Sequence, residues 1–131
     1  METKMIWANL PVSDLERTAK FYRGLGFKPN GTFNADLVSF FFGKANFIIH
    51  FFVEKQFKIA ARLENKELHS GTEIIFSLSA DSRTKVDAWL EKVKKAGATI
   101  YSEASDFDKG YTFGFSDPDG HKFNVLYWPS E

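Results

Sequence analysis

Few residues of this chain have side chains that suggest chemistry. Asp117 and Asp119, in SDPDGH, are paired carboxylates, and such a pair can act as general acid and base in a buried cleft. The same stretch has the composition of a tight turn, because Pro118 presets φ at the second position and Gly120 suits the exit. We therefore interpret both aspartates as turn residues.

The three histidines are the other candidates for proton transfer or metal binding. His121 has the strand parity of Phe123 and Val125, on the side expected to face a helix, so it should pack or cap the turn. His69 lies in a polar connector, where we expect a solvated loop residue. His50 lies in the strand-like run FIIHFF, and we place it on the face without a helix, where small ligands bind.

Aromatic side chains are abundant, with fifteen Phe, four Tyr and three Trp. Most are expected in the core, because a sheet that is covered on both sides buries both of its faces. The side chains expected to line a pocket, on the face without a helix, are Trp7, Phe52 and Trp128, joined by His50 and Asn124. For Trp7 and Trp128, plain packing is the alternative interpretation.

The elements that must position these residues follow a β-α-β-β-β pattern in the first half. Residues 6–12 alternate as a strand, and a helix is predicted to start at Ser13, with Glu16 completing a capping box. Gly24 and Gly26 are expected to end this helix. Three further strands are predicted at 27–33, 37–42 and 46–53.

The same order returns in the second half. A strand that ends at Ala80 leads into a helix begun by Asp81 or Ser82 and ended by Gly97. Three more strands are predicted at 98–103, 111–115 and 122–128. A repeated supersecondary unit is therefore the main organising feature of the chain.

Two connecting segments have their own signals. Residues 54–71 are charged, lack proline, and are expected to form a helical connector that ends in a loop. The stretch SDFDKGY, with Asp106, Asp108, Lys109 and Tyr111, is expected to form a loop that gates access to a pocket.

Each predicted repeat has a sheet with one face that its own helix covers and one that it cannot cover alone. Two such sheets can curl around a shared concavity, which is the default place for a small ligand. We therefore predict an α+β fold, with a cupped, mostly antiparallel sheet around a shared pocket. The prediction is one domain over residues 1–131, with repeats at 1–53 and 72–131 joined by the connector 54–71.

Composition excludes several classes of function. The 131 residues suit one domain, and 17 basic residues balance 17 acidic ones, so no positive charge favours nucleic acid or an anionic membrane. The absence of cysteine excludes disulfides and thiolate nucleophiles, and METKMIWANL lacks the apolar core of a signal peptide. No phosphate-binding glycine loop or nucleophile–base pair supports a kinase or hydrolase. We expect a cytoplasmic protein with a small-molecule partner.

The motifs NLPVSDLERTAKFYRGLGF and FGFSDPDGHKFNVLYW, with the repeated order, resemble the vicinal oxygen chelate superfamily. This superfamily groups glyoxalase I, extradiol dioxygenases, fosfomycin-resistance enzymes and bleomycin-resistance proteins. The chain is most similar to its predicted lactoylglutathione lyase group, through MIWANLPVSDL, SADSRTKVDAW and DPDGH. The resemblance implies the glyoxalase/bleomycin-resistance fold and a homodimer, as in many relatives.

The resemblance also implies where a metal would bind. Family metal sites use His and Glu side chains on four strands, and the corresponding positions here hold Trp7, His50, Ile75 and Asn124. Only His50 is a good ligand, and one imidazole with a neutral amide falls short of what a divalent metal needs. We therefore expect no metal or other cofactor. The alternative is a divalent metal held by His50, Asn124 and Glu73, which shares the parity of Ile75.

Two functions remain in view. The first is a protein that binds a hydrophobic or cationic small molecule in an aromatic-lined pocket, with a degenerate metal site and no lactoylglutathione lyase activity. Its expected lining is Trp7, His50, Phe52, Ile75, Asn124 and Trp128. The alternative is a metal-dependent glyoxalase-like lyase, or a related enzyme such as a dioxygenase relative, that uses His50. Neither function identifies the substrate or catalytic residues.

Overall fold

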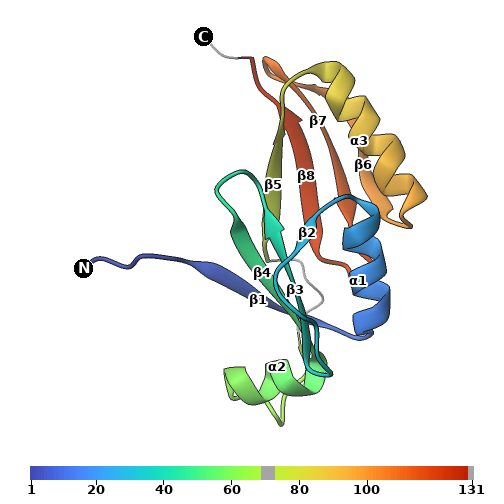
Figure 1. The fold of residues 1–131 in the computed structure, drawn as a ribbon. Coiled ribbons are helices and arrows are strands. Elements are labelled where there is room, and N and C mark those ends of the chain that lie inside the picture. Colours follow the sequence, from blue (N-terminus) through green and yellow to red (C-terminus); the bar gives the residue numbers. More distant parts are fainter. Residues whose placement is uncertain (69–72, 130–131) are drawn as a thin grey trace. The chain divides into compact units, whose positions relative to one another are not determined.

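The structure is a computed structural model that describes residues 1–68 and 73–129. The chain divides into two compact units, Met1–Leu68 (the N-terminal unit) and His69–Glu131 (the C-terminal unit). Each unit contains one β-α-β-β-β motif, so the predicted order of elements is confirmed in both halves (Figure 1). The division falls inside the predicted connector, and His69, for which a solvated loop was expected, lies outside the described residues. That the two halves make one domain stays a prediction.

The N-terminal unit is a four-stranded mixed sheet in the order β1-β4-β3-β2. Its strands are β1 (Trp7–Val12), β2 (Lys28–Pro29), β3 (Leu37–Phe42) and β4 (Phe47–Val53), and its helices are α1 (Leu15–Gly24) and α2 (Glu54–Ala61). The β1–β4 pair is parallel and the other pairs are antiparallel. Helix α2 confirms the helix predicted in the connector.

The core of the N-terminal unit lies between α1 and one face of this sheet. Alternate residues of β3 and β4 point toward the helix, and Phe40 and Phe51 are fully buried there. Tyr22 of α1 is also fully buried and stacks on Phe51, with ring centroids 4.6 Å apart. Aromatic pairs of this kind stabilise a core beyond the area that they bury, by about 0.5–1.5 kcal/mol each.

The C-terminal unit repeats this architecture in the sheet order β5-β8-β7-β6. Its strands are β5 (Ile75–Ala80), β6 (Thr99–Phe107), β7 (Gly110–Ser116) and β8 (Lys122–Tyr127), and its helix is α3 (Arg83–Lys95). The β5–β8 pair is parallel and the other pairs are antiparallel. In both units, therefore, most strand pairs are antiparallel, as predicted.

Helix α3 lies along one face of the second sheet (Figure 1). Its buried residues Val86 and Val93 pack toward Phe113, Phe115 and Phe123, which are at most 1% exposed. The rings of Phe115 and Phe123 are stacked, with centroids 5.2 Å apart. None of the helices in the described ranges is long and apolar enough to span a membrane.

Helix α1 begins one residue later than predicted. Asp14 is the N-cap, and its carboxylate accepts a hydrogen bond from the backbone N–H of Arg17 at 3.1 Å. Ser13 accepts a hydrogen bond from the Arg17 guanidinium at 2.7 Å and is not the N-cap, so the predicted start of the helix is wrong by one residue. Ser and Asp are equally good N-caps, and adjacent candidates are not separated by sequence pattern alone.

The predicted gating loop at SDFDKGY is also wrong. Strand β6 continues to Phe107, which pairs with Gly110, so only Asp108 and Lys109 form the turn. Asp108 adopts a positive φ of 53°, which a tight two-residue hairpin requires and which Asp tolerates better than most residues.

This hairpin is held against α3 rather than free to close over a site. The Arg83 guanidinium lies 2.7 Å from the Asp106 carboxylate and 4.2 Å from the centroid of the Tyr111 ring. The Tyr111 hydroxyl donates a hydrogen bond to Asp87 at 2.7 Å, and this bond raises the pKa of Tyr111.

The structural interpretation of SDPDGH is confirmed. Asp117 is buried, and its carboxylate accepts hydrogen bonds from the backbone N–H groups of Asp119 and His121, each at 2.9 Å. His121 is buried on the helix side with Phe123, as its parity predicted. These contacts make the carboxylate of Asp117 part of the turn before β8.

Candidate functional site

His50 lies at the centre of the face that α1 leaves uncovered, here called the open face of the N-terminal unit. Its neighbours Ile49 and Phe51 are buried on the helix side, so His50 points the other way. The strand register places Asn9 of β1 and Ser39 of β3 directly opposite His50. A polar row therefore crosses three strands that are otherwise mainly apolar.

Two aromatic rings flank His50 on the open face. The Trp7 and His50 ring centroids are 6.3 Å apart and the His50 and Phe52 centroids are 6.0 Å apart, both in edge-to-face arrangements. Trp7 is 49% exposed, so it is not a core residue. The structure thus brings together three of the residues that the sequence placed in the site.

Hydrogen bonds hold His50 in place. Its Nδ1 lies 2.8 Å from the hydroxyl of Ser39, and the side-chain amide of Asn30 donates to the same hydroxyl at 3.1 Å. Partial burial lowers the pKa of His50 below its ordinary value of 6.5, because the charged imidazolium loses hydration. Sequence reasoning missed both partners, although Ser39 is a polar residue within the apolar strand LVSFFF.

The open face of the C-terminal unit is the face of its sheet that α3 leaves uncovered. It carries the other residues that the sequence predicted to line a pocket. Asn124 of β8 is paired in register with Ser77 and Gly114, and its Oδ1 atom is buried with no hydrogen-bond partner among the described residues. Ile75 is opposite Lys122 and is 53% exposed. An apolar side chain exposed at this position is suited to contact with a ligand or another protein surface.

Tyr101 of β6 is a further residue of this face, and sequence reasoning missed it. Its ring lies over Gly114 in the space that a Cβ atom would fill, and its hydroxyl donates to the backbone carbonyl of Phe123 at 3.1 Å. The Lys122 ammonium lies 4.7 Å from the Tyr101 ring centroid. Burial raises the pKa of Tyr101. Only Gly at position 114 allows this approach.

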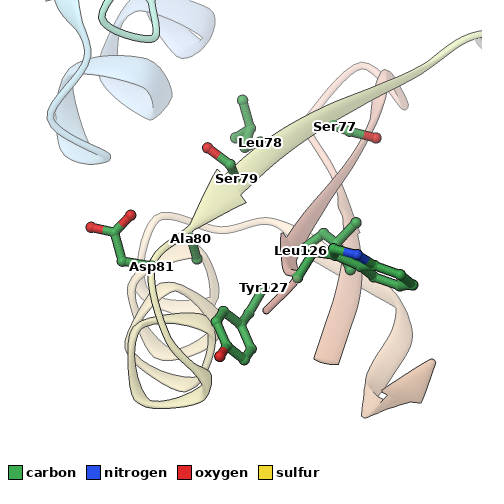
Figure 2. A pocket seen from close by; sticks show the side chains of 8 residues that line it. Ser77, Leu78, Ser79, Ala80, Asp81, Leu126 and Tyr127 are labelled. Atoms are coloured by element: carbon green, nitrogen blue, oxygen red, sulfur yellow. The ribbon is translucent and has the colours of Figure 1, made fainter. Parts of the chain in front are cut away.

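Among the described residues, two surface grooves that each lie within one unit contain neither His50 nor Asn124. One, of about 500 Å³, runs along the end of β5 beside Leu126 and Tyr127 of β8 (Figure 2). Its lining is Ser77, Leu78, Ser79, Ala80, Asp81, Leu126, Tyr127 and Trp128. The other, of about 460 Å³, lies between α1 and the segment from Phe33 to Val38, where Arg23 stacks over Phe33. Of the predicted site residues, only Trp128 lines either groove.

Glu73, the other side chain predicted as a possible metal ligand, belongs to a different unit from His50. Glu73 precedes β5 and is exposed in the C-terminal unit, whereas His50 belongs to the N-terminal unit. Within the described part of each unit, no three His, Asp or Glu side chains gather as a metal site would require.

Comparison with known proteins assigns the family. The model of the Glyoxalase/Bleomycin resistance protein/Dioxygenase superfamily matches residues 4–125, so the chain belongs to this superfamily. The resemblance seen in the sequence motifs is confirmed by this match. Comparison with curated protein sequences gives no match.

Solved structures share the fold over nearly the whole chain. A hypothetical protein from S. aureus is 30% identical, with a TM-score of 0.84 over 98% of this chain and 96% of that one. The lactoylglutathione lyase from Agrobacterium tumefaciens is 20% identical, with a TM-score of 0.71 over 99% of this chain and 100% of the other. A fosfomycin resistance protein from Listeria monocytogenes is 21% identical, with a TM-score of 0.72, over 100% and 95%. The last two similarities concern the fold alone.

Proposed function

We propose that this member of the superfamily binds a small organic molecule on the open face of its N-terminal unit, without a resident metal and without lactoylglutathione lyase activity. The observation that carries the proposal is the grouping of Trp7, His50 and Phe52 on the open face of the N-terminal unit. A half-exposed indole beside a partly buried imidazole offers a flat apolar surface with one polar group, as small-molecule sites commonly do. Aromatic and cationic compounds are the favoured ligand class.

The donor set supports a function without a metal. Of the four positions that the family uses for its metal, Trp7 and Ile75 supply no suitable lone pair and Asn124 supplies only a neutral amide. His50 is the remaining donor, and because its Nδ1 contacts the Ser39 hydroxyl at 2.8 Å, it could offer a metal one ring nitrogen, Nε2. These residues do not fit a divalent cation that must be held against water.

A ligand screen followed by tryptophan fluorescence tests the proposal. Trp7 and Trp128 were each predicted from the sequence to line a pocket and are 49% and 45% exposed, so a ring bound beside either indole should change its emission. The screen uses aromatic and cationic compounds against the wild type, Trp7→Phe and Trp128→Phe, with Trp89 on α3 as the background emitter in all three. We expect binding signals that Trp7→Phe or Trp128→Phe reduces. Tight binding whose signal neither substitution alters would place the site elsewhere.

The metal-dependent lyase is the competing function. Its support is the shared fold with a lactoylglutathione lyase at 20% identity. Turnover of the lyase substrate that stops on removal of metal by a chelator would establish it and overturn the present proposal.

A further inference from the structure

Ser39 is a buried serine, 2% exposed, that makes two side-chain hydrogen bonds on the open face of the N-terminal unit. One joins its hydroxyl to Asn30 Nδ2 at 3.1 Å and the other joins it to His50 Nδ1 at 2.8 Å. A serine hydroxyl has one proton to donate and two lone pairs to accept with. Ser39 can therefore be the donor in only one of these two hydrogen bonds.

The direction of both bonds follows from the chemistry of the partners. The amide nitrogen of Asn30 is a donor only, so the Ser39 oxygen accepts from it. The hydroxyl proton of Ser39 then needs an acceptor, because a buried unsatisfied O–H costs about 1–3 kcal/mol. Among the described residues, His50 Nδ1 is the side-chain atom placed to accept it. A neutral imidazole that accepts at Nδ1 carries its proton at Nε2.

We propose that Ser39 holds His50 as the Nε2–H tautomer, so that His50 is a hydrogen-bond donor that selects ligands carrying an acceptor oxygen on an aromatic group. The selection of a ligand rests on the proposed function, whereas the tautomer is a property of the free protein. Ser39 is a positioning residue, and His50 is the residue that contacts the ligand.

The surroundings of His50 agree with this assignment. No hydrogen bond to Nε2 is formed by any residue in the described ranges, so this donor is available on the open face between Trp7 and Phe52. Strands β1, β3 and β4 contain no Asp, Glu, Lys or Arg that would favour the imidazolium or compete for its proton. An aromatic ligand packed near Trp7 would bring a ring carbonyl or ether oxygen within reach of Nε2.

The tautomer is measured first, in the free protein, by two-bond ¹H–¹⁵N correlation spectra of the histidine rings at pH 7.5. We expect a protonated Nε2 and an unprotonated Nδ1 for His50. Ser39→Ala should reduce this preference to that of a free imidazole, whereas Ser105→Ala, an exposed serine of β6, should leave it unchanged. A protonated Nδ1 in the wild type, or no effect of Ser39→Ala, would overturn the assignment.

Ligand selection is measured second, with acetophenone and its hydrocarbon isostere α-methylstyrene as probes. One neutral hydrogen bond predicts that the wild type binds acetophenone roughly 2- to 10-fold more tightly. His50→Gln, which keeps an N–H near the place of Nε2, should retain the preference, and His50→Leu should abolish it. The titration follows the Trp7 indole N–H signal by NMR.

The outcomes separate the two proposals. Equal binding of both probes by the wild type, or a preference that survives in His50→Leu, would overturn the donor role of His50. Binding of neither probe with His50 in the expected tautomer would contradict ligand binding at Trp7, and with it the proposed function, while supporting the assignment of Ser39.

Discussion

At the scale of single residues, His50 differs from the other described histidine in its surroundings. His121 is buried behind the turn before β8, where its backbone is bound to Asp117, whereas His50 is partly exposed among Trp7, Phe52 and Ser39. From the sequence, His50 was predicted to be a site residue because of its type and its parity on the strand. It did not identify Ser39 and Asn30, because their contact with His50 depends on the pairing register of β3 and β4, which no local pattern encodes.

His50 should make stability depend on pH. Its folded-state pKa is lowered below 6.5 by burial, so the unfolded chain binds the proton more readily. Its contribution is therefore fully present above pH 6.5 and is lost as the pH falls through the lower folded-state value. Urea unfolding at pH 7.5 and pH 5 should show a smaller loss on acidification for His50→Asn than for the wild type. An equal loss in both proteins would contradict this prediction.

At the scale of elements, the two β-α-β-β-β motifs could be predicted because their helices and strands have clear periodicity and glycine ends. The errors lie where local signals compete. Ser13 and Asp14 are both good caps, and strand β2 contains only Lys28 and Pro29 instead of the predicted seven residues. The glycine and the polar residues of SDFDKGY indicate a loop, but cross-strand pairing extends β6 to Phe107.

The contact of Tyr101 with Gly114 links strands β6 and β7. Gly114→Ala would place a Cβ atom against the Tyr101 ring and should cost about 1–3 kcal/mol of unfolding free energy. In a Tyr101→Ala background the same change should be neutral or stabilising, because alanine is less flexible than glycine. Urea unfolding of the four proteins of this double-mutant cycle provides the test. Equal costs in both backgrounds would show that the ring is not the cause.

At the scale of the whole molecule, the sheet orders leave β1 and β5 at the edges of their sheets. Ile6, which directly precedes β1, and Ile75 of β5 are 76% and 53% exposed. Exposed apolar edges favour association, so we predict a homodimer. Light scattering should give about twice the chain mass of 15.0 kDa at micromolar concentration. A mass near 15.0 kDa at every concentration would contradict the dimer.

Membership of the superfamily follows from motifs spread over the whole chain, but the chemistry of a member depends on a few side chains. For this chain we propose that those side chains include Trp7, His50, Ile75 and Asn124, whose types argue against a metal. The structure adds the engagement of His50 Nδ1 with Ser39 at 2.8 Å. We therefore propose that this chain uses the fold to bind an organic ligand without a metal.

The metal content of the purified protein tests this proposal directly. The wild type and His50→Gln are dialysed against buffers that contain Zn²⁺ or Ni²⁺, then against metal-free buffer, and the metal per chain is determined by mass spectrometry. We predict far less than one metal per chain in both proteins, because the donors present cannot hold a divalent ion against water. One metal per wild-type chain that is lost in His50→Gln would contradict a function without a metal.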